Sequence, residues 1–182
     1  MIKHIFQITL WIIVISISAR LSFDIPLTEI NTTGQTLSIL TMAIVARPRV
    51  AIPAIIIYVI LGITGLPIFS DGNNGWSYFI GPTLGYIVGF ILSVVFITTI
   101  YWNNKEHEWA QGWMSILILH LLGSFIILFC GVLRLSLIKP FIDAMITGFT
   151  PFILSAIIKS LLGVVLVAGV HKYNRSEISI SD

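Results

Sequence analysis

Charged residues are scarce along this chain, and most of them fall in short intervals between long apolar segments. They make up 10% of its 182 residues, whereas hydrophobic residues make up 57% and the mean hydropathy is +1.00. Ordinary soluble domains carry about 25% charged residues. Because a soluble fold could not hydrate so apolar a surface, we predict an all-α integral membrane protein.

Six apolar segments divide the chain, and each is a candidate transmembrane helix, which needs about 20 mostly apolar residues. They cover 1–19, 34–46, 51–62, 77–102, 113–133 and 151–170. The connections are short. We expect an irregular segment over 134–150 and a polar tail over 172–182. The sequence therefore predicts a single transmembrane domain over 1–182, with no separate soluble domain.

The first apolar segment, 1–19, has two interpretations. Its basic start at Lys3, its apolar centre and the small residues Ser16 and Ser18 are typical of a signal peptide. The alternative is a retained first helix. We favour the retained helix, because the later segments carry topogenic signals of their own.

Basic residues are unevenly shared between the two sides that six spanning helices define. One side holds both tails and two basic turns, with Lys3, Arg47, Arg49, Lys105, Lys172 and Arg175, and the other holds Arg20, Arg134 and Lys139. Cytoplasmic loops are enriched in Lys and Arg. We therefore expect both termini in the cytoplasm and the polar loop 70–75 on the outer side.

The stretch 62–90 joins the end of one apolar helix to the start of the next through this loop. Gly81, Gly85 and Gly89 recur every four residues, so we expect them on one face of the second helix. That face has no side chains. Either another helix or a flat ligand can therefore approach its backbone closely.

Two blocks of this stretch, GLPIF over 65–69 and GPTLGY over 81–86 followed by Gly89 and Phe90, resemble a family signature. They are similar to the BioY family, the biotin-binding S-components of energy-coupling-factor (ECF) vitamin transporters. The resemblance implies six transmembrane helices in a bacterial cell membrane and capture of biotin from the outer side. It implies as partners an ECF transmembrane coupling subunit and two ATPase subunits. Biotin would be cargo, so we expect no cofactor, no metal and no enzymatic activity.

Lys159 is the strongest single candidate for a ligand contact. It lies eight residues after Pro151, about 12 Å along a helix and inside the hydrocarbon layer. A lysine there either faces a cavity or partner, which we favour, or snorkels to the headgroups. The family resemblance implies an acid–lysine pair that holds the ligand, but its aspartate position is Ala156 here. Lys159 would then be neutral, pair with the ligand carboxylate, or borrow one of three acids, which are Asp71, Asp143 and Glu29.

The remaining candidate ligand-binding residues are Gln35, Asn73, Gly81, Gly85 and Tyr86. The block TGQTL, which contains Gln35, also resembles the family; the alternative role for Gln35 is to cap its helix. Asn73 matches a ligand-contacting asparagine of the family by its distance from Gly81, whereas ordinary turn chemistry is the alternative. Some members carry an arginine after the Gly-Tyr pair, where this chain has an isoleucine.

Other functions find less support in the sequence. The net charge of +2 and the lack of a basic stripe argue against nucleic acid. No phosphate-binding GxxxxGK[ST] pattern occurs, so we expect no ATP hydrolysis by this chain. The four histidines do not have the spacing of metal ligands. His120 lies inside the apolar segment 113–133, so we expect its side chain to be packed and hydrogen-bonded. Two alternatives remain: an S-component for another small vitamin-like carboxylate, and a small intramembrane enzyme that uses Lys159 as base or Schiff-base amine.

Overall fold

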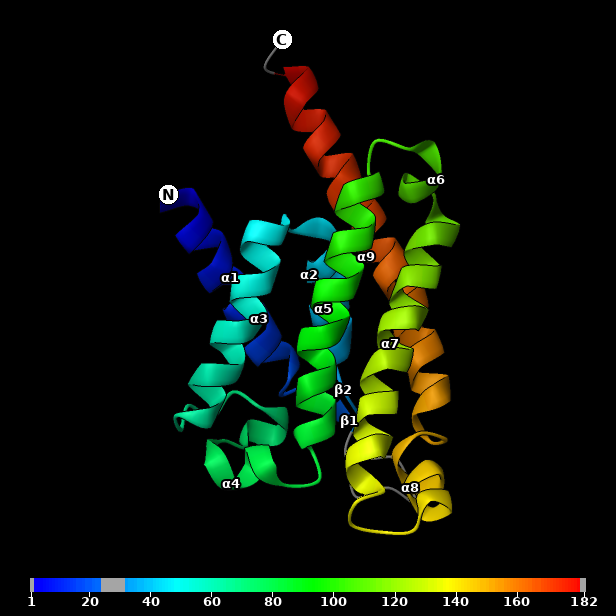
Figure 1. Cartoon of the computed structure of the whole chain (residues 1–182). Coiled ribbons are helices and arrows are strands. Elements are labelled where there is room, and N and C mark those ends of the chain that lie inside the picture. The colour runs from blue at the N-terminus through cyan, green and yellow to red at the C-terminus, as the bar shows by residue number, and fades with distance from the viewer. Residues whose placement is uncertain (1, 24–31, 181–182) are drawn as a thin grey trace.

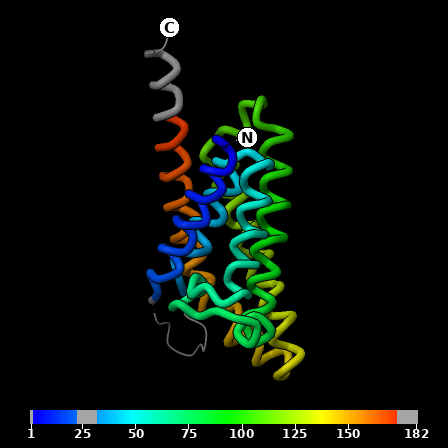
Figure 2. The backbone as a smooth tube through the Cα atoms, turned by 90° about the vertical axis from the view of Figure 1, so that its left-hand side faces the viewer, coloured from blue at the N-terminus to red at the C-terminus, as the bar shows by residue number. Residues whose placement is uncertain are grey.

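The structure, a computed structural model, describes residues 2–23 and 32–180, which form a helical bundle (Figure 1). Its long helices run roughly along one axis, as Figure 2 shows from the side. In chain order the elements are α1 (Ile2–Ser18), β1 (Ser22–Phe23), β2 (Thr32–Thr33), α2 (Gln35–Val45), α3 (Pro48–Ile63), the short 3-10 helix η1 (Ser70–Gly72), α4 (Gly75–Ile80), α5 (Leu84–Asn104), α6 (Glu108–Gln111), α7 (Trp113–Leu135), α8 (Phe141–Gly148) and α9 (Phe152–Ile180). The two strands pair antiparallel.

The six apolar segments of the sequence correspond to α1, α2, α3, α5, α7 and α9, which confirms the predicted all-α fold. Three stretches are long and apolar enough to cross a membrane, namely Leu84–Asn104, Trp113–Leu135 and Phe152–Lys172. The helices α1, α2 and α3 are apolar but shorter, with 17, 11 and 16 residues. The bundle therefore combines full-length spanning helices with shorter ones.

The helix expected over 77–102 is in fact two helices, α4 and α5, with a break at residues 81–83. Gly81 ends α4 in an extended conformation, with φ −67° and ψ −161°. Pro82 follows it and has no N–H group to continue the helix. Gly81 therefore lies outside α5, and the prediction that it shares a helix face with Gly85 and Gly89 is wrong.

Three other boundaries differ from the sequence prediction. The third apolar helix begins at Pro48 and not at residue 51, because proline is well suited to a first helical turn. The segment 134–150, expected to be irregular, contains α8, whose eight residues are too few for a clear periodicity. The expected tail continues α9 as far as Ile180, and no glycine or proline interrupts residues 171–180.

The helix α3 ends at Ile63, one residue beyond the predicted segment, and a left-handed glycine, Gly65, follows it. Gly65 has φ +109°, a conformation that glycine adopts without strain. The Leu66 N–H donates a hydrogen bond to the Leu61 carbonyl at 3.1 Å, as in a helix that ends on such a glycine. This ending turns the chain into the polar loop.

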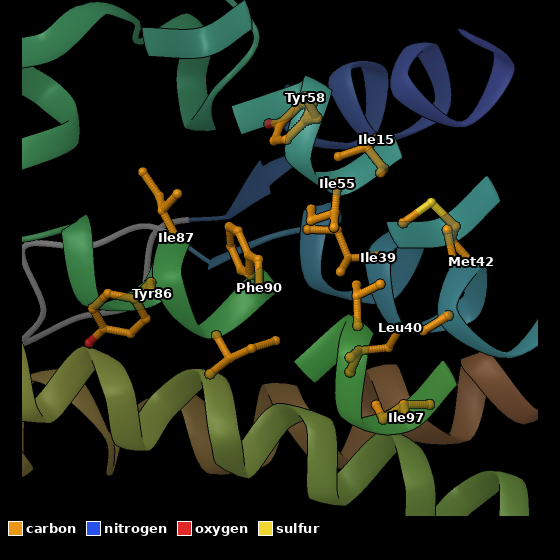
Figure 3. Close-up of a cluster of buried hydrophobic side chains, with 14 of the residues drawn as sticks. Ile15, Ile39, Leu40, Met42, Ile55, Tyr58, Tyr86, Ile87, Phe90 and Ile97 are labelled. Carbon is orange, nitrogen blue, oxygen red and sulfur yellow. The ribbon is translucent and has the colours of Figure 1, made fainter. Parts of the chain in front are cut away.

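The core is centred on α2, which packs against α1, α3, α5, α7 and α9. Its side chains Ile39, Leu40 and Met42 are almost fully buried, and Figure 3 shows them among residues of α1, α3 and α5. Thr98 of α5 donates a hydrogen bond to the Ala43 carbonyl at 2.6 Å, which ties α5 to this central helix. The short helix α2 is thus enclosed by longer ones.

The two ends of the bundle differ in what they carry (Figure 1). One end, called the tail end here, has the start of α1, the α2–α3 turn, α6 and the last part of α9. The other, called the loop end, has β1, β2, α4, the loop between α3 and α5, and α8. This is the grouping that the basic residues predicted, with Arg47 and Lys105 at the tail end.

Candidate functional site

A cavity opens among α2, α5, α7 and α9 toward the loop end, where β2, η1 and α4 complete its wall. Its empty space is about 710 Å³, counting the part open to solvent. Most of its wall is apolar, from Phe69, Tyr86, Ile87, Phe90, Ile127, Leu128 and Phe152. Polar groups come from Thr32, Thr33, Gln35, Thr36, Ser70, Tyr78, Thr83, Ser124, Ser155 and Lys159.

Lys159 lines this cavity from α9. Its Nζ donates a hydrogen bond to Thr32 Oγ1 at 3.1 Å, and Thr32 Oγ1 lies 3.0 Å from Ser155 Oγ. No carboxylate among the described residues, Asp71 and Asp143 included, forms an ion pair with Lys159. Glu29, the third acid considered, lies outside the described residues. Lys159 therefore brings a positive charge to a cavity wall whose other described polar groups are uncharged.

Ala156, at the position of the missing acid, also lines the cavity. It lies three residues before Lys159, so the two residues share a face of α9. An aspartate at this position would stand beside the lysine. In this chain Lys159 has no acidic neighbour at that position.

Gln35 lies at the start of α2, is only 3% exposed and also lines the cavity. Its Nε2 donates to the Tyr58 hydroxyl at 2.8 Å, and that hydroxyl donates to the Ile68 carbonyl at 2.6 Å. The Gln35 side chain does not cap the start of α2, where the Gln35 N–H donates instead to Thr33 Oγ1 at 3.3 Å. Gln35 thus links α2, α3 and the polar loop at the cavity wall.

Tyr86 lines the cavity from the first turn of α5 and is 7% exposed. Its ring fills the space that a side chain at Gly131 would need, and its hydroxyl donates to the Gly148 carbonyl at 2.7 Å. The ring lies 6.3 Å, centre to centre, from that of Phe152. Tyr86 therefore joins α5, α7 and α8 at the same place where it faces the cavity.

Neither Gly81 nor Gly85 is among the residues that line the cavity. A Cβ at Gly85 would overlap the Cys130 carbonyl of α7, so a helix occupies this glycine face. The Gly81 carbonyl accepts a hydrogen bond from Arg134 Nε at 3.3 Å, while Arg134 Nη2 donates to the Ile80 carbonyl at 2.6 Å. Both glycines shape the structure around the cavity.

Asn73 is an exposed residue of the loop and is not among the residues that line the cavity. Its Nδ2 donates to the Ser70 carbonyl at 2.8 Å, and its own carbonyl accepts from the Phe69 N–H at 3.1 Å. The loop is tied to the bundle by Arg20, whose Nη2 donates to the Pro67 carbonyl at 2.6 Å. Asn73 thus holds the turn that presents Phe69 and Ser70 to the cavity.

Several cavity residues were not predicted from the sequence. Tyr78 reaches the cavity from α4, and burial raises the pKa of its hydroxyl. Thr32 and Ser155 lie 123 positions apart in the chain, so only the fold brings them together. Ser124 did carry a signal, because it is a lone hydroxyl in the apolar run 121–130.

His120 lies deeper in the bundle and is 1% exposed. Its Nδ1 lies 3.0 Å from the Ile116 carbonyl, and its Nε2 lies 3.5 Å from Thr41 Oγ1. The prediction of a packed, hydrogen-bonded histidine is confirmed. Within the described part of the chain, no three histidine, cysteine or acidic residues are grouped so that they could hold a metal ion.

Known proteins resemble this chain in sequence over most of its length. The model of the BioY family matches residues 1–176. The biotin transporter BioY2 of Lactococcus lactis subsp. cremoris is 31% identical over 94% of this chain and 95% of its own length. The biotin transporter BioY of Thermotoga maritima is 28% identical over 82% of this chain and 85% of its own length.

A solved structure agrees with the fold. The S-component for biotin from an ECF-type ABC transporter superposes with a TM-score of 0.85 at 25% sequence identity. The match covers 94% of this chain and 92% of the other. Together with the apolar helices, this likeness supports a multi-pass membrane protein with the cavity among its helices.

Proposed function

This chain belongs to the BioY family of membrane transport proteins, and from that premise we propose that it binds biotin in the cavity at its loop end. It would take biotin from the outer side of a bacterial cell membrane and release it inward. The observation that carries this proposal is Lys159, a cation on an apolar cavity wall with no carboxylate partner among the described residues.

Biotin suits such a cavity chemically. It has a carboxylate on a flexible alkyl chain and, at the other end, a compact fused ring with a cyclic urea. A buried carboxylate is costly unless it is paired and hydrogen-bonded. The Lys159 ammonium offers that pairing, with the hydroxyls of Thr32 and Ser155 beside it. The aromatic and aliphatic walls suit the alkyl chain and the ring.

The other predicted ligand-binding residues enter the proposal with different roles. Gln35 and Tyr86 line the cavity, so we assign them direct contacts with biotin. Asn73 closes the turn that carries Phe69 and Ser70, and it would contact biotin only if this turn moves over the ligand. Gly81 and Gly85 would act by setting the position of Tyr86 at the start of α5.

The transport cycle requires partners. We propose that an ECF transmembrane coupling subunit and two ATPase subunits drive release, because this chain has no phosphate-binding motif of its own. The positive-inside rule places the tail end, with Arg47 and Lys105, in the cytoplasm. The cavity then opens outward, as capture of an external solute requires.

The proposed role is binding without covalent change, and the family and the relatives are transporters. The alternative of an enzyme based on Lys159 requires a second reactive group. Lys159 Nζ donates to the Thr32 hydroxyl, which is itself within hydrogen-bond distance of the Ser155 hydroxyl. Borohydride trapping of an adduct on Lys159 would revive that alternative.

Calorimetry with biotin and the detergent-purified protein tests the proposal. We expect saturable binding at one site per chain, competed weakly or not at all by lipoate and pantothenate. Preferential binding of another carboxylate would support the alternative of an S-component for a different vitamin, which the loss of the acid at Ala156 favours. A folded protein that binds no member of the panel would refute the proposed function.

A further inference from the structure

The side chain of Ser124, in the middle of α7, has an unusual position for a helical serine. It lines the cavity, is only 3% exposed, and its Oγ has no hydrogen-bond partner among the described residues. A buried polar group without a partner keeps the full cost of its desolvation. Such a group calls for an explanation in terms of what it is there to bind.

Other helical serines of this chain satisfy their hydroxyls locally. In a helix, a serine hydroxyl commonly donates to the carbonyl three or four residues earlier. The residues that do so here are Ser16, Ser18, Ser38, Ser93 and Ser160, at donor–acceptor distances of 2.7–3.5 Å. Ser124 does not use this option, so its hydroxyl remains available to the cavity.

Ser124 lies at the same depth in the bundle as Lys159. The helices α7 and α9 run antiparallel (Figure 1), and a Cβ at Gly163 would overlap the His120 Nε2, so these two residues face each other. Ser124 follows His120 by four residues, and Lys159 precedes Gly163 by four. Each step is about 6 Å toward the loop end, which brings Ser124 and Lys159 level on facing helices.

We propose that Ser124 is a ligand-binding residue whose hydroxyl donates a hydrogen bond to the same carboxylate that Lys159 binds. This inference rests on the proposed function. Lys159, Thr32, Ser155 and Ser124 can all donate hydrogen bonds, and only the lysine carries a charge. The positive charge favours an anionic acceptor, to which hydroxyls beside the lysine can also donate.

The test measures biotin affinity of Ser124→Ala beside a matched control, Ser93→Ala. Ser93 is also a fully buried helical serine, but its hydroxyl is satisfied by the Phe90 carbonyl at 3.0 Å, and it does not line the cavity. A hydrogen bond to a charged group contributes about 1.5–3 kcal/mol. We therefore expect biotin binding about tenfold weaker in Ser124→Ala and within about twofold of the parent in Ser93→Ala.

A second ligand identifies the group that Ser124 contacts. The second ligand is a biotin analogue with a methyl group in place of the carboxylate. We expect Ser124→Ala to change the affinity for this analogue by less than about twofold, because the carboxylate that the hydroxyl would bind is absent. The affinity for the analogue, which binds weakly, is measured by displacement of radiolabelled biotin. Thermal unfolding of the ligand-free variants in detergent measures their stability.

The possible results separate this inference from the proposed function. An unchanged biotin affinity in a folded Ser124→Ala protein would overturn the inference alone. Equal losses for biotin and for the methyl analogue would also overturn it, because the hydroxyl would then contact the ring end. No biotin binding by the unmodified protein would instead reject the proposed function, and the inference with it.

Discussion

Two faces of α5 meet their surroundings in opposite ways. One face carries Gly85 and Gly89 and lies against the backbone of α7, where an added Cβ would overlap the Cys130 carbonyl or come within 2.8 Å of Ile127 Cα. The other carries Tyr86, Ile87 and Phe90 and lines the cavity. We call the contact between the first face and α7 the glycine seam. On the α7 side it includes Gly131, whose missing side chain leaves room for the Tyr86 ring.

The difference shows how one helix serves both packing and binding. At the glycine seam the missing side chains let two helices approach closely, as small residues commonly do in membrane proteins. On the cavity face, large side chains form walls while α2, α7 and α9 supply polar groups. Substitutions should therefore affect folding at the seam and ligand affinity at the cavity.

The largest expected effect comes from Gly85→Val at the seam. The valine side chain would overlap the Cys130 carbonyl, which belongs to a helix backbone and has little room to shift. Overpacking of a tight interior costs about 1–3 kcal/mol and occasionally more, and we expect the upper end here. Thermal unfolding and size-exclusion chromatography in detergent should show loss of most of the folded protein.

Gly169→Ala is the matched control for that variant. Gly169 lies in α9, and a Cβ there would meet no atom within 4 Å. We expect its stability to remain that of the parent or to rise slightly, because alanine favours a helix over glycine. Equal stabilities of Gly85→Val and Gly169→Ala would show that the seam tolerates side chains and would break the contrast between the two faces.

The second effect concerns the cavity and should leave the fold intact. Lys159→Met keeps a long side chain but removes the charge and its hydrogen bond to Thr32. We expect biotin affinity to fall about 100-fold, while the stability of the ligand-free protein is kept or raised, because a charge at this depth is costly. Calorimetry and thermal unfolding of the same sample measure the two quantities. Biotin affinity retained by a folded variant would place the anchor elsewhere.

The seam and the cavity were not equally predictable from the sequence. The spacing of Gly85 and Gly89 indicated a face open to close approach, but it could not tell that α7 is the neighbour, because the contact depends on tertiary packing. Gly81 and Pro82 indicated a helix start, but the predicted bounds 77–102 ran through them, because the surrounding run is apolar on both sides. The six apolar segments could be predicted from the sequence, because hydropathy is a local property of the chain.

For the cavity, the sequence identified Lys159, Gln35 and Tyr86, because a charge, an amide and an aromatic ring stand out in apolar runs. It did not identify Thr32 and Ser155. The hydrogen bonds of Thr32 with Lys159 and with Ser155 join β2 to α9. The role of Asn73 was left open between a turn and a ligand contact, and its bond to Ser70 shows the turn. Assignment of these residues to biotin remains a prediction.

The third prediction tests which end of biotin lies at Lys159. It restores the acid that the family pattern places beside the lysine. Ala156→Asp would set a carboxylate three residues before Lys159 on the same face. If Lys159 binds the carboxylate of biotin, the new acid competes for the lysine and repels the ligand, so affinity should fall about tenfold. Tighter binding in calorimetry would instead place the cyclic urea at Lys159, since a carboxylate accepts hydrogen bonds from its N–H groups.

The smallest expected effect belongs to Tyr86→Phe, at the residue that takes part in both faces. The change removes the hydrogen bond from the hydroxyl to the Gly148 carbonyl, at 2.7 Å, but keeps the ring against Gly131 and in the cavity wall. A hydrogen bond of this kind contributes about 1 kcal/mol, so thermal unfolding should show a small loss of stability, whereas biotin affinity should stay within a few-fold of the parent. A loss of affinity of tenfold or more at unchanged stability would contradict this division, because the hydroxyl would then act on the ligand and not on α8.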